Sequence, residues 1–392
     1  MEYQANAILT IGALLLLGIV TNAIGQRTPI PRVTLLLIFG FIIGPSGFNL
    51  LPLFCAEIFP LVAKMALLMV GFILGERMSL IYLHTAARQI LIISMTEVIV
   101  TAGIVLTGLY LAGVNINMAL LLAAISTATA PAATVDVIHE KNASGKFTHA
   151  LEGIVAIDDA WGLMVFSIMM AIVLSIIGSE GISSVFIHGF IEIGGAFLLG
   201  ILLGAPMSYL TGRIKPGEPT LIEALGFVFL CGGLAIVLNV SYLLAAMTMG
   251  AVVVNFAKHH TRPFNAIKHI ETPFMILFFI LAGASFKIDA LDAVWLTVIV
   301  YILMRITGRL IGGWIGAALS GGDRIMKNWI GMALMPQAGV ALGMALVASH
   351  RFPEIGKTLL PIIIGTTVFF ELTGPIMTRM ALVKAGDIPD NK

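Results

Sequence analysis

Two adjacent aspartates, Asp158 and Asp159, stand in the stretch "VAIDDAWGLM" (155–164), which is otherwise almost entirely apolar. An ionised side chain at the centre of a bilayer costs at least about 2.5 kcal/mol, so such groups are rare in membrane spans and mark ion or proton pathways. A carboxylate can bind a small cation through its hard oxygen atoms, and it can instead hold a proton. Because two neighbouring carboxylates in a dry site repel each other, one of them tends to take up a positive charge. Competition between a cation and a proton for that carboxylate would couple their movements in opposite directions.

Three further ionisable residues, Glu97, Arg305 and Glu371, fall within other apolar stretches. At 1.5 Å of rise per helical residue, both aspartates, Glu97 and Arg305 lie about 13–16 Å from one end of their spans. This common depth predicts one buried polar cluster. Since a buried base needs a partner, we expect Glu97 and Arg305 to form a direct ion pair that holds helices together. Glu371 is either a hydrogen-bonding group for the backbone or part of a proton path.

The elements that must position these residues are membrane helices. The chain has 392 residues, of which 59% are hydrophobic and 11% are charged, and its mean hydropathy is +1.03. Soluble domains carry about 25% charged residues, so the composition predicts an all-α polytopic membrane protein. Cys55 and Cys231 match no metal or redox spacing, and the spans contain no nucleophile–base or metal-ligand set. We therefore expect neither an enzyme nor a nucleic-acid-binding protein.

Apolar runs long enough to cross about 30 Å of hydrocarbon occur about thirteen times. The expected spans are 6–25, 33–50, 57–75, 88–112, 117–138, 149–178, 185–210, 219–238, 240–257, 267–286, 294–320, 325–349 and 357–381. Sixteen Lys and Arg residues lie in one set of alternate connections and the tail, against three (Lys287, Arg351 and Lys357) in the opposite set. By the positive-inside rule, this predicts an external N-terminus and a cytoplasmic C-terminus. Arg309, within the eleventh span, is expected to extend toward the cytoplasmic surface.

Two spans contain helix breakers near their middle. "AAISTATAPAATV" (123–135) contains Ser126, Thr127, Thr129 and Pro131, and "ALMPQAGVALG" (333–343) contains Pro336 and Gln337. Irregular backbone at membrane depth is tolerated where it is buried in protein or lines a cavity. Because the two broken spans are the fifth and the twelfth, the second runs antiparallel to the first. This layout predicts inverted repeats with two crossing broken helices and a transport site near the midplane.

The segments "STATAPAATVDVI" and "GIVAIDDAWGLM" resemble the broken-helix and paired-aspartate segments of bacterial sodium/proton antiporters, which belong to the monovalent cation:proton antiporter superfamily. "RITGRLIGG" and "ALMPQAGVALGMALVAS" are similar to later spans of this superfamily, so the resemblance covers essentially the whole chain. It implies that Asp159 is the main carboxylate for the cation and the proton, with Asp158 beside it. Thr129 matches a threonine next to the site, and Na⁺ would bind at Asp159.

The resemblance also implies an architecture: a core that moves against a dimerisation domain, in a homodimer in a prokaryotic plasma (inner) membrane. The expected parts are dimerisation-domain helices in 1–87 and 213–290, core helices in 88–180 and 291–384, a linker helix in 181–212 and a cytoplasmic tail in 385–392.

We therefore expect exchange of Na⁺, and of Li⁺, for H⁺, with no resident cofactor. Two alternatives stay open: K⁺/H⁺ exchange on the same fold and sodium-coupled symport of an organic solute. The chain has Asp158-Asp159 where electroneutral exchangers usually have Asn-Asp. If Glu97 neutralises Arg305, the aspartates carry two negative charges, and this favours exchange of two protons per cation.

Overall fold

The computed structural model describes residues 2–25, 32–52, 54–80, 88–177, 182–211, 220–286, 294–337 and 339–388. This part of the chain is all-helical, with fifteen helices. They are α1 (Glu2–Gly25), α2 (Arg32–Ile43), α3 (Phe54–Glu76), α5 (Arg88–Leu111), α6 (Ile116–Ile125), α7 (Pro131–Glu140), α8 (Lys146–Ile177), α9 (Ile182–Thr211), α10 (Thr220–Val237), α11 (Tyr242–Phe256), α12 (Thr261–Ala284), α14 (Trp295–Leu319), α15 (Arg324–Ala333), α16 (Gly339–Arg351) and α17 (Pro353–Ala385).

Eight of the described helices are long and apolar enough to cross a membrane, and four of the shorter ones are also apolar. Each apolar run expected from the sequence contains at least one helix, and two runs are divided. Residues 126–130 separate α6 from α7, and a second break, with residues 334–337 described, follows the end of α15 at Ala333. Pro131 is the first residue of α7, where its missing N–H leaves no hydrogen bond unmade. Lys287 and residues 389–392 of the expected tail lie outside the described residues.

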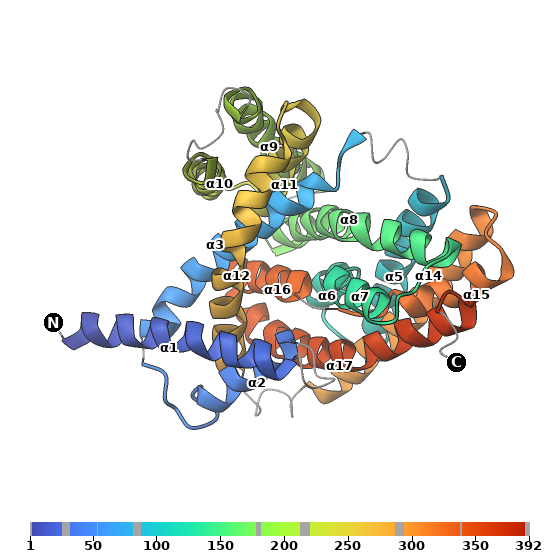
Figure 1. The fold of residues 1–392 in the computed structure, drawn as a ribbon, viewed down its shortest axis with the longest axis horizontal. Helices are drawn as coiled ribbons and strands as arrows, with labels where there is room; N and C mark the ends of the chain where they lie inside the picture. Colours follow the sequence, from blue (N-terminus) through green and yellow to red (C-terminus); the bar gives the residue numbers. More distant parts are fainter. Residues whose placement is uncertain are drawn as a thin grey trace.

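The helices pack as two bundles, which Figure 1 shows side by side. The core bundle consists of α5–α8 and α14–α17, and it lies on the right of the view, at the end where the chain terminates. The flanking bundle consists of α1–α3 and α9–α12. Helices α8 and α9 pack against each other across the boundary, and the other contacts between the bundles are sparse, including those of α3 with α16 and of α2 with α17. The boundary is therefore much less extensively packed than either bundle.

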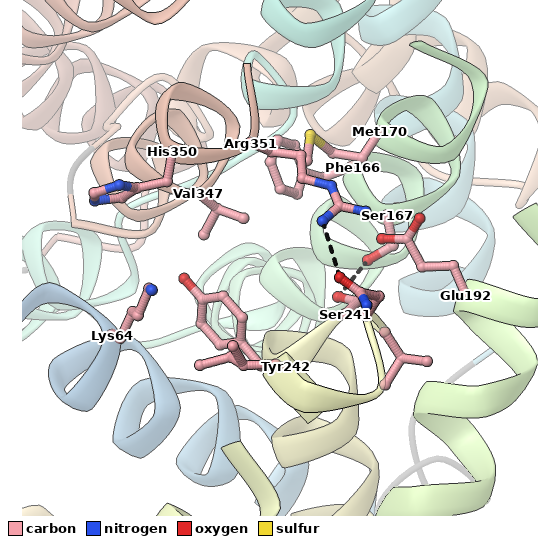
Figure 2. A pocket seen from close by; sticks show the side chains of 13 residues that line it. Lys64, Phe166, Ser167, Met170, Glu192, Ser241, Tyr242, Val347, His350 and Arg351 are labelled. Carbon is pink, nitrogen blue, oxygen red and sulfur yellow. Dashed lines mark hydrogen bonds between the residues drawn. The ribbon is translucent and has the colours of Figure 1, made fainter. Parts of the chain in front are cut away.

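A cavity of about 200 Å³ opens along this boundary (Figure 2). We call it the vestibule. Both bundles line it, and its polar lining includes Lys64, Ser167, Glu192, Ser241, His350 and Arg351. Phe166 also lines the vestibule, two helical turns beyond Asp159 on α8. The vestibule thus extends along α8 to within about two turns of the aspartates, and Asp158 and Asp159 themselves are almost completely buried.

The most extensive packing in the core bundle is between α5 and α14, and it depends on glycines spaced four residues apart on α14. A Cβ atom added to Gly308 or Gly312 would lie 2.8 Å from the Cα atom of Thr101 or 2.9 Å from that of Glu97, respectively. Small residues at this spacing let two membrane helices approach closely. The side chain of Arg309, next to Gly308, is thereby brought within reach of α5.

The residues that follow α17 contact the first turn of α8. Helix α17 ends at Gly386 in the left-handed conformation (φ 75°), and the Oδ2 atom of Asp387 then accepts hydrogen bonds from the backbone N–H and the Oγ1 of Thr148, both at 2.8 Å. Thr148 lies in the first turn of α8, whose N–H groups have no partner within the helix. Asp387 therefore caps the helix that carries the paired aspartates.

Candidate functional site

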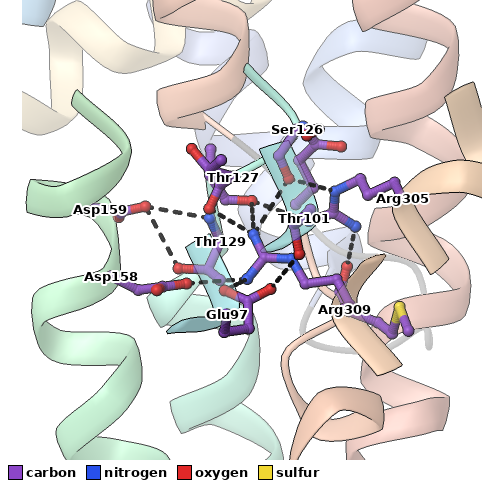
Figure 3. Close-up of polar contacts among 12 residues, drawn as sticks. Glu97, Thr101, Ser126, Thr127, Thr129, Asp158, Asp159, Arg305 and Arg309 are labelled. Atoms are coloured by element: carbon purple, nitrogen blue, oxygen red, sulfur yellow. Dashed lines mark hydrogen bonds and ion pairs between the residues drawn. The ribbon is translucent and has the colours of Figure 1, made fainter. Parts of the chain in front are cut away.

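The buried polar cluster expected from the sequence is present, and Arg309 is at its centre (Figure 3). The Nη1 atom of Arg309 lies 2.8 Å from Oε2 of Glu97 and 3.0 Å from Oδ2 of Asp158. All three side chains are completely buried. Thr101, one turn along α5, donates a hydrogen bond of 2.9 Å to the other oxygen of Glu97. One guanidinium therefore forms ion pairs with two carboxylates from two different helices.

The prediction of an ion pair between Glu97 and Arg305 is wrong, because Glu97 pairs with Arg309. Arg305 lies one turn earlier on α14, and its Nε and Nη2 atoms donate to the carbonyls of Ser126 at 3.0 Å and Ala128 at 2.9 Å. Its Nη1 atom donates to the carbonyl of Met335 at 2.8 Å, and its guanidinium stacks over Phe370 at 4.2 Å. These carbonyls belong to the two helix breaks, where no helical N–H satisfies them. The hydrogen-bond partners of Arg305 are thus backbone carbonyls.

Arg309 is fully buried and does not extend to the surface as the sequence suggested. Its Nη2 atom also donates to the carbonyls of Ser126 and Ala128, at 3.2 and 3.1 Å, and to that of Thr127. The signal that could have identified it is spacing: residues four apart on a helix share a face, so Arg309 had to point where Arg305 points.

Side chains of α14 form hydrogen bonds with both helix breaks. The two arginines bind four carbonyls in the breaks that directly follow α6 and α15, and the C-terminal end of a helix carries partial negative charge. Gln337, in the second break, donates from Nε2 to the carbonyl of Ile125 at 3.2 Å and to the hydroxyl of Tyr301 on α14 at 3.1 Å. The irregular backbone therefore has the internal partners that a membrane interior demands.

Asp159 has a different environment from Asp158. Its Oδ1 atom accepts weak hydrogen bonds from the backbone N–H and the hydroxyl of Thr129, at 3.2 and 3.4 Å. Its Oδ2 atom is buried and has no hydrogen-bond partner, and no ion pair joins Asp159 to any residue that the structure describes. Thr129 lies in the first break, so the broken helix presents its polar atoms to this carboxylate.

The other residues singled out in the sequence take structural positions in the breaks. The hydroxyls of Ser126 and Thr127 donate back to the preceding turn of α6, at 2.6 and 2.7 Å, and only their carbonyls contact the arginines. Pro336 packs closely against Gly374 of α17.

Glu371 stands apart from the cluster. Its Oε2 atom accepts a hydrogen bond of 2.7 Å from the hydroxyl of Thr34 on α2, across the boundary between the bundles. Among the described residues, no group of three or more His, Cys, Asp or Glu side chains could hold a metal ion together. Asp159 is thus the acid of the cluster that has no ion pair with a described base.

The chain is similar to known proteins over most of its length. Residues 11–384 match the protein family described as "Sodium/hydrogen exchanger, transmembrane". A curated relative, the ammonium/H⁺ antiporter subunit AmhT of Alkalihalophilus pseudofirmus, is 19% identical over 342 residues, which are 86% of this chain and 85% of the relative. The structure of the sodium proton antiporter MjNhaP1 from Methanocaldococcus jannaschii at pH 8 has a TM-score of 0.81 at 18% identity, covering 98% of this chain and 99% of that one. A three-dimensional electron-microscopy map of the same antiporter gives 0.68 at 19% identity, covering 97% of this chain and 95% of that one.

Proposed function

The chain belongs to the family of transmembrane sodium/hydrogen exchangers, and from this premise we propose that it exchanges Na⁺, and also Li⁺, for H⁺ at Asp159. As a family member it is a monovalent cation/proton antiporter, and hence a transporter and not an enzyme. Our proposal includes thirteen membrane spans, an external N-terminus, a cytoplasmic C-terminus, a prokaryotic plasma membrane and a homodimer. In it, the core bundle moves against the flanking bundle and exposes Asp159 to each side in turn.

One observation carries the assignment of Asp159: its buried carboxylate has an oxygen without a hydrogen-bond donor and no ion pair to a described base. An ionised carboxylate in such a place is strongly disfavoured unless a positive charge neutralises it. A proton or a monovalent cation supplies that charge, and the two exclude each other at the same oxygen atoms. Thr129 supplies a hydroxyl oxygen next to the carboxylate, and oxygen ligands of this kind suit small hard cations.

Asp158 has a different part in this proposal, because Arg309 already neutralises it. Guanidinium remains protonated in proteins, so Arg305 and Arg309 contribute two fixed positive charges. Glu97, Asp158 and Asp159 contribute three negative charges when ionised. One negative charge is left, and one monovalent cation or one proton balances it. The second arginine therefore favours exchange of one proton per cation over the two protons that the paired aspartates alone suggest.

The transported cation is the part of this proposal with the strongest rivals. K⁺/H⁺ exchange uses the same fold, and the curated relative AmhT is named as an ammonium/H⁺ antiporter subunit. The four carbonyls of the breaks that bind the arginines are directed at guanidinium groups, which leaves the carboxylate of Asp159 and the hydroxyl of Thr129 as the ligands that we assign. Symport of an organic solute would need a roomy polar site, whereas Asp159 is 1% exposed and its described hydrogen bonds are both with Thr129.

The deciding experiment uses the purified chain in proteoliposomes that contain a pH-sensitive dye. External Na⁺, Li⁺, K⁺, NH₄⁺ and choline are added in turn, with NH₄⁺ corrected for diffusion of neutral ammonia in protein-free vesicles. We expect proton movement with Na⁺ and Li⁺ and none with choline. Exchange restricted to K⁺ or NH₄⁺ would replace the cation and keep the antiport, and no proton movement with any cation would refute the proposed function.

Asp159→Asn should abolish exchange, because the amide can neither release a proton nor neutralise a cation. Asp158→Asn should only impair it, since Arg309 keeps Glu97 as a partner. Thermal unfolding in detergent is the control measurement, and it should show that Asp159→Asn is folded. Substantial Na⁺/H⁺ exchange by Asp159→Asn would contradict the assignment.

A further inference from the structure

Three side-chain hydrogen bonds between described residues cross the boundary between the core and flanking bundles. Two lie at the vestibule and are long: Ser167 to Ser241 at 3.4 Å, and Arg351 to Asn239 at 3.5 Å (Figure 2). The third joins Thr34 to Glu371 at 2.7 Å, and it is buried and outside the vestibule. Among the described residues, one of these three hydrogen bonds is short, and a carboxyl group is part of it.

Glu371 has few neutralising partners. Its side chain is 2% exposed, and among the described residues it forms a hydrogen bond with Thr34 and no ion pair. Helices α2, α6, α7, α8, α14, α15 and α16 pack against α17. The charged or titratable residues on these helices are Arg32, Asp136, His139, Glu140, Lys146, His149, Glu152, Asp158, Asp159, Tyr301, Arg305, Arg309, Arg324, Lys327, His350 and Arg351. Arg305 stacks on Phe370, the residue before Glu371, and its guanidinium binds backbone carbonyls.

We infer that Glu371 is a second proton-binding residue of the transport cycle, a latch whose neutral carboxyl holds the two bundles together and whose deprotonation releases them. The inference rests on the proposed function, since it adds to Asp159 a second residue that binds H⁺ during exchange. One hydroxyl donor compensates only a small part of the cost of burying an ionised carboxylate. The closed boundary is therefore compatible with the neutral form. The ionised form requires water, which reaches Glu371 when the bundles separate.

The latch gives exchange a pH dependence with a definite sign. Lower pH keeps Glu371 neutral and favours the closed boundary, so movement of the core bundle slows. Higher pH removes the proton and favours separation, so exchange accelerates. A ligand shifts such an equilibrium only through its different affinity for the two states, and here the proton binds the closed state better. Asp159 carries the transported proton in either case, so the latch changes rate and leaves coupling intact.

Two substitutions should change the pH profile in opposite directions. Glu371→Gln keeps an acceptor for Thr34 and cannot ionise, so the latch stays closed and the rate at alkaline pH should fall about two- to tenfold, the range that one net hydrogen bond gives. Thr34→Val removes the donor, so the rate at acidic pH should rise by a similar factor. Thr34→Ser keeps the hydroxyl and should retain the wild-type profile.

The experiment measures initial rates of Na⁺/H⁺ exchange between pH 6 and 9 in proteoliposomes, with Thr373→Val as a control. Thr373 is on the same helix, and among the described residues its hydroxyl bonds only the carbonyl of Phe369, so its loss should leave the profile unchanged. Parallel loss of rate at every pH in both latch variants would show a purely structural contact and overturn the inference, as would wild-type profiles in both. Absence of exchange in the wild-type chain would instead refute the proposed function.

Discussion

At the scale of single residues, the sequence predicts that Glu97, Asp158 and Asp159 share a buried cluster, which the structure contains, and it pairs Glu97 with the wrong base. Apolar flanks reveal a buried carboxylate, and counting residues gives its depth. Neither gives the direction in which a side chain leaves its helix. Arg305 and Arg309 differ by one turn in depth, and that turn decides which of them meets Glu97 and which meets the carbonyls of the breaks. This difference can be tested through stability.

Arg309→Ala should strongly destabilise the protein, because it leaves Glu97 and Asp158 buried without their base. Removing one partner of a buried ion pair costs about 3–5 kcal/mol. Adding Glu97→Gln to Arg309→Ala should recover part of that loss, as measured by thermal unfolding in detergent. Arg305→Ala is the matched control, since it loses carbonyl contacts that Glu97→Gln cannot replace. If Glu97→Gln instead raised the stability of Arg305→Ala and not that of Arg309→Ala, the result would support an ion pair between Glu97 and Arg305.

At the scale of helices, apolar length and helix breakers predict the elements well. Each expected run contains a helix, and both interruptions occur at the predicted spans. What the sequence does not show is which helices touch, because lipid-facing and protein-facing surfaces are equally apolar. The expected pairing of Glu97 with an arginine of the eleventh span did place α5 beside α14. How closely the two helices approach depends on the glycines of "RITGRLIGGWIG", which the prediction did not use.

Gly312→Ala should push α14 away from α5 and weaken the site. The new Cβ would lie 2.9 Å from the Cα atom of Glu97, so backbone rather than a flexible side chain must move. Overpacking of this kind costs about 1–3 kcal/mol. Gly103→Ala on α5 is the control, because its Cβ would meet nothing within 4 Å, and its stability should equal or exceed that of the wild type. Equal melting temperatures for both variants would show that the contact tolerates expansion.

At the scale of the whole molecule, the balance of fixed charge makes a prediction about voltage. If one monovalent charge neutralises the cluster in each direction, a complete cycle moves no net charge. The ΔpH at which flux reverses should therefore depend on the Na⁺ gradient and not on a membrane potential set by K⁺ and valinomycin. A reversal point that shifts with the imposed potential would show that Asp158 also exchanges its proton, despite its contact with Arg309.

The ion pair between Asp158 and Arg309 also has a consequence for synthesis of the protein. The two residues are 151 positions apart in the chain. At about 5–20 residues per second, the ribosome makes Arg309 roughly 8–30 s after Asp158. For that interval, the first acids of the cluster enter the membrane with neither arginine available to neutralise them. The nascent helices α5 to α8 must therefore insert with protonated acids or wait beside the translocation machinery, and chains that terminate before α14 should be substrates for membrane proteases.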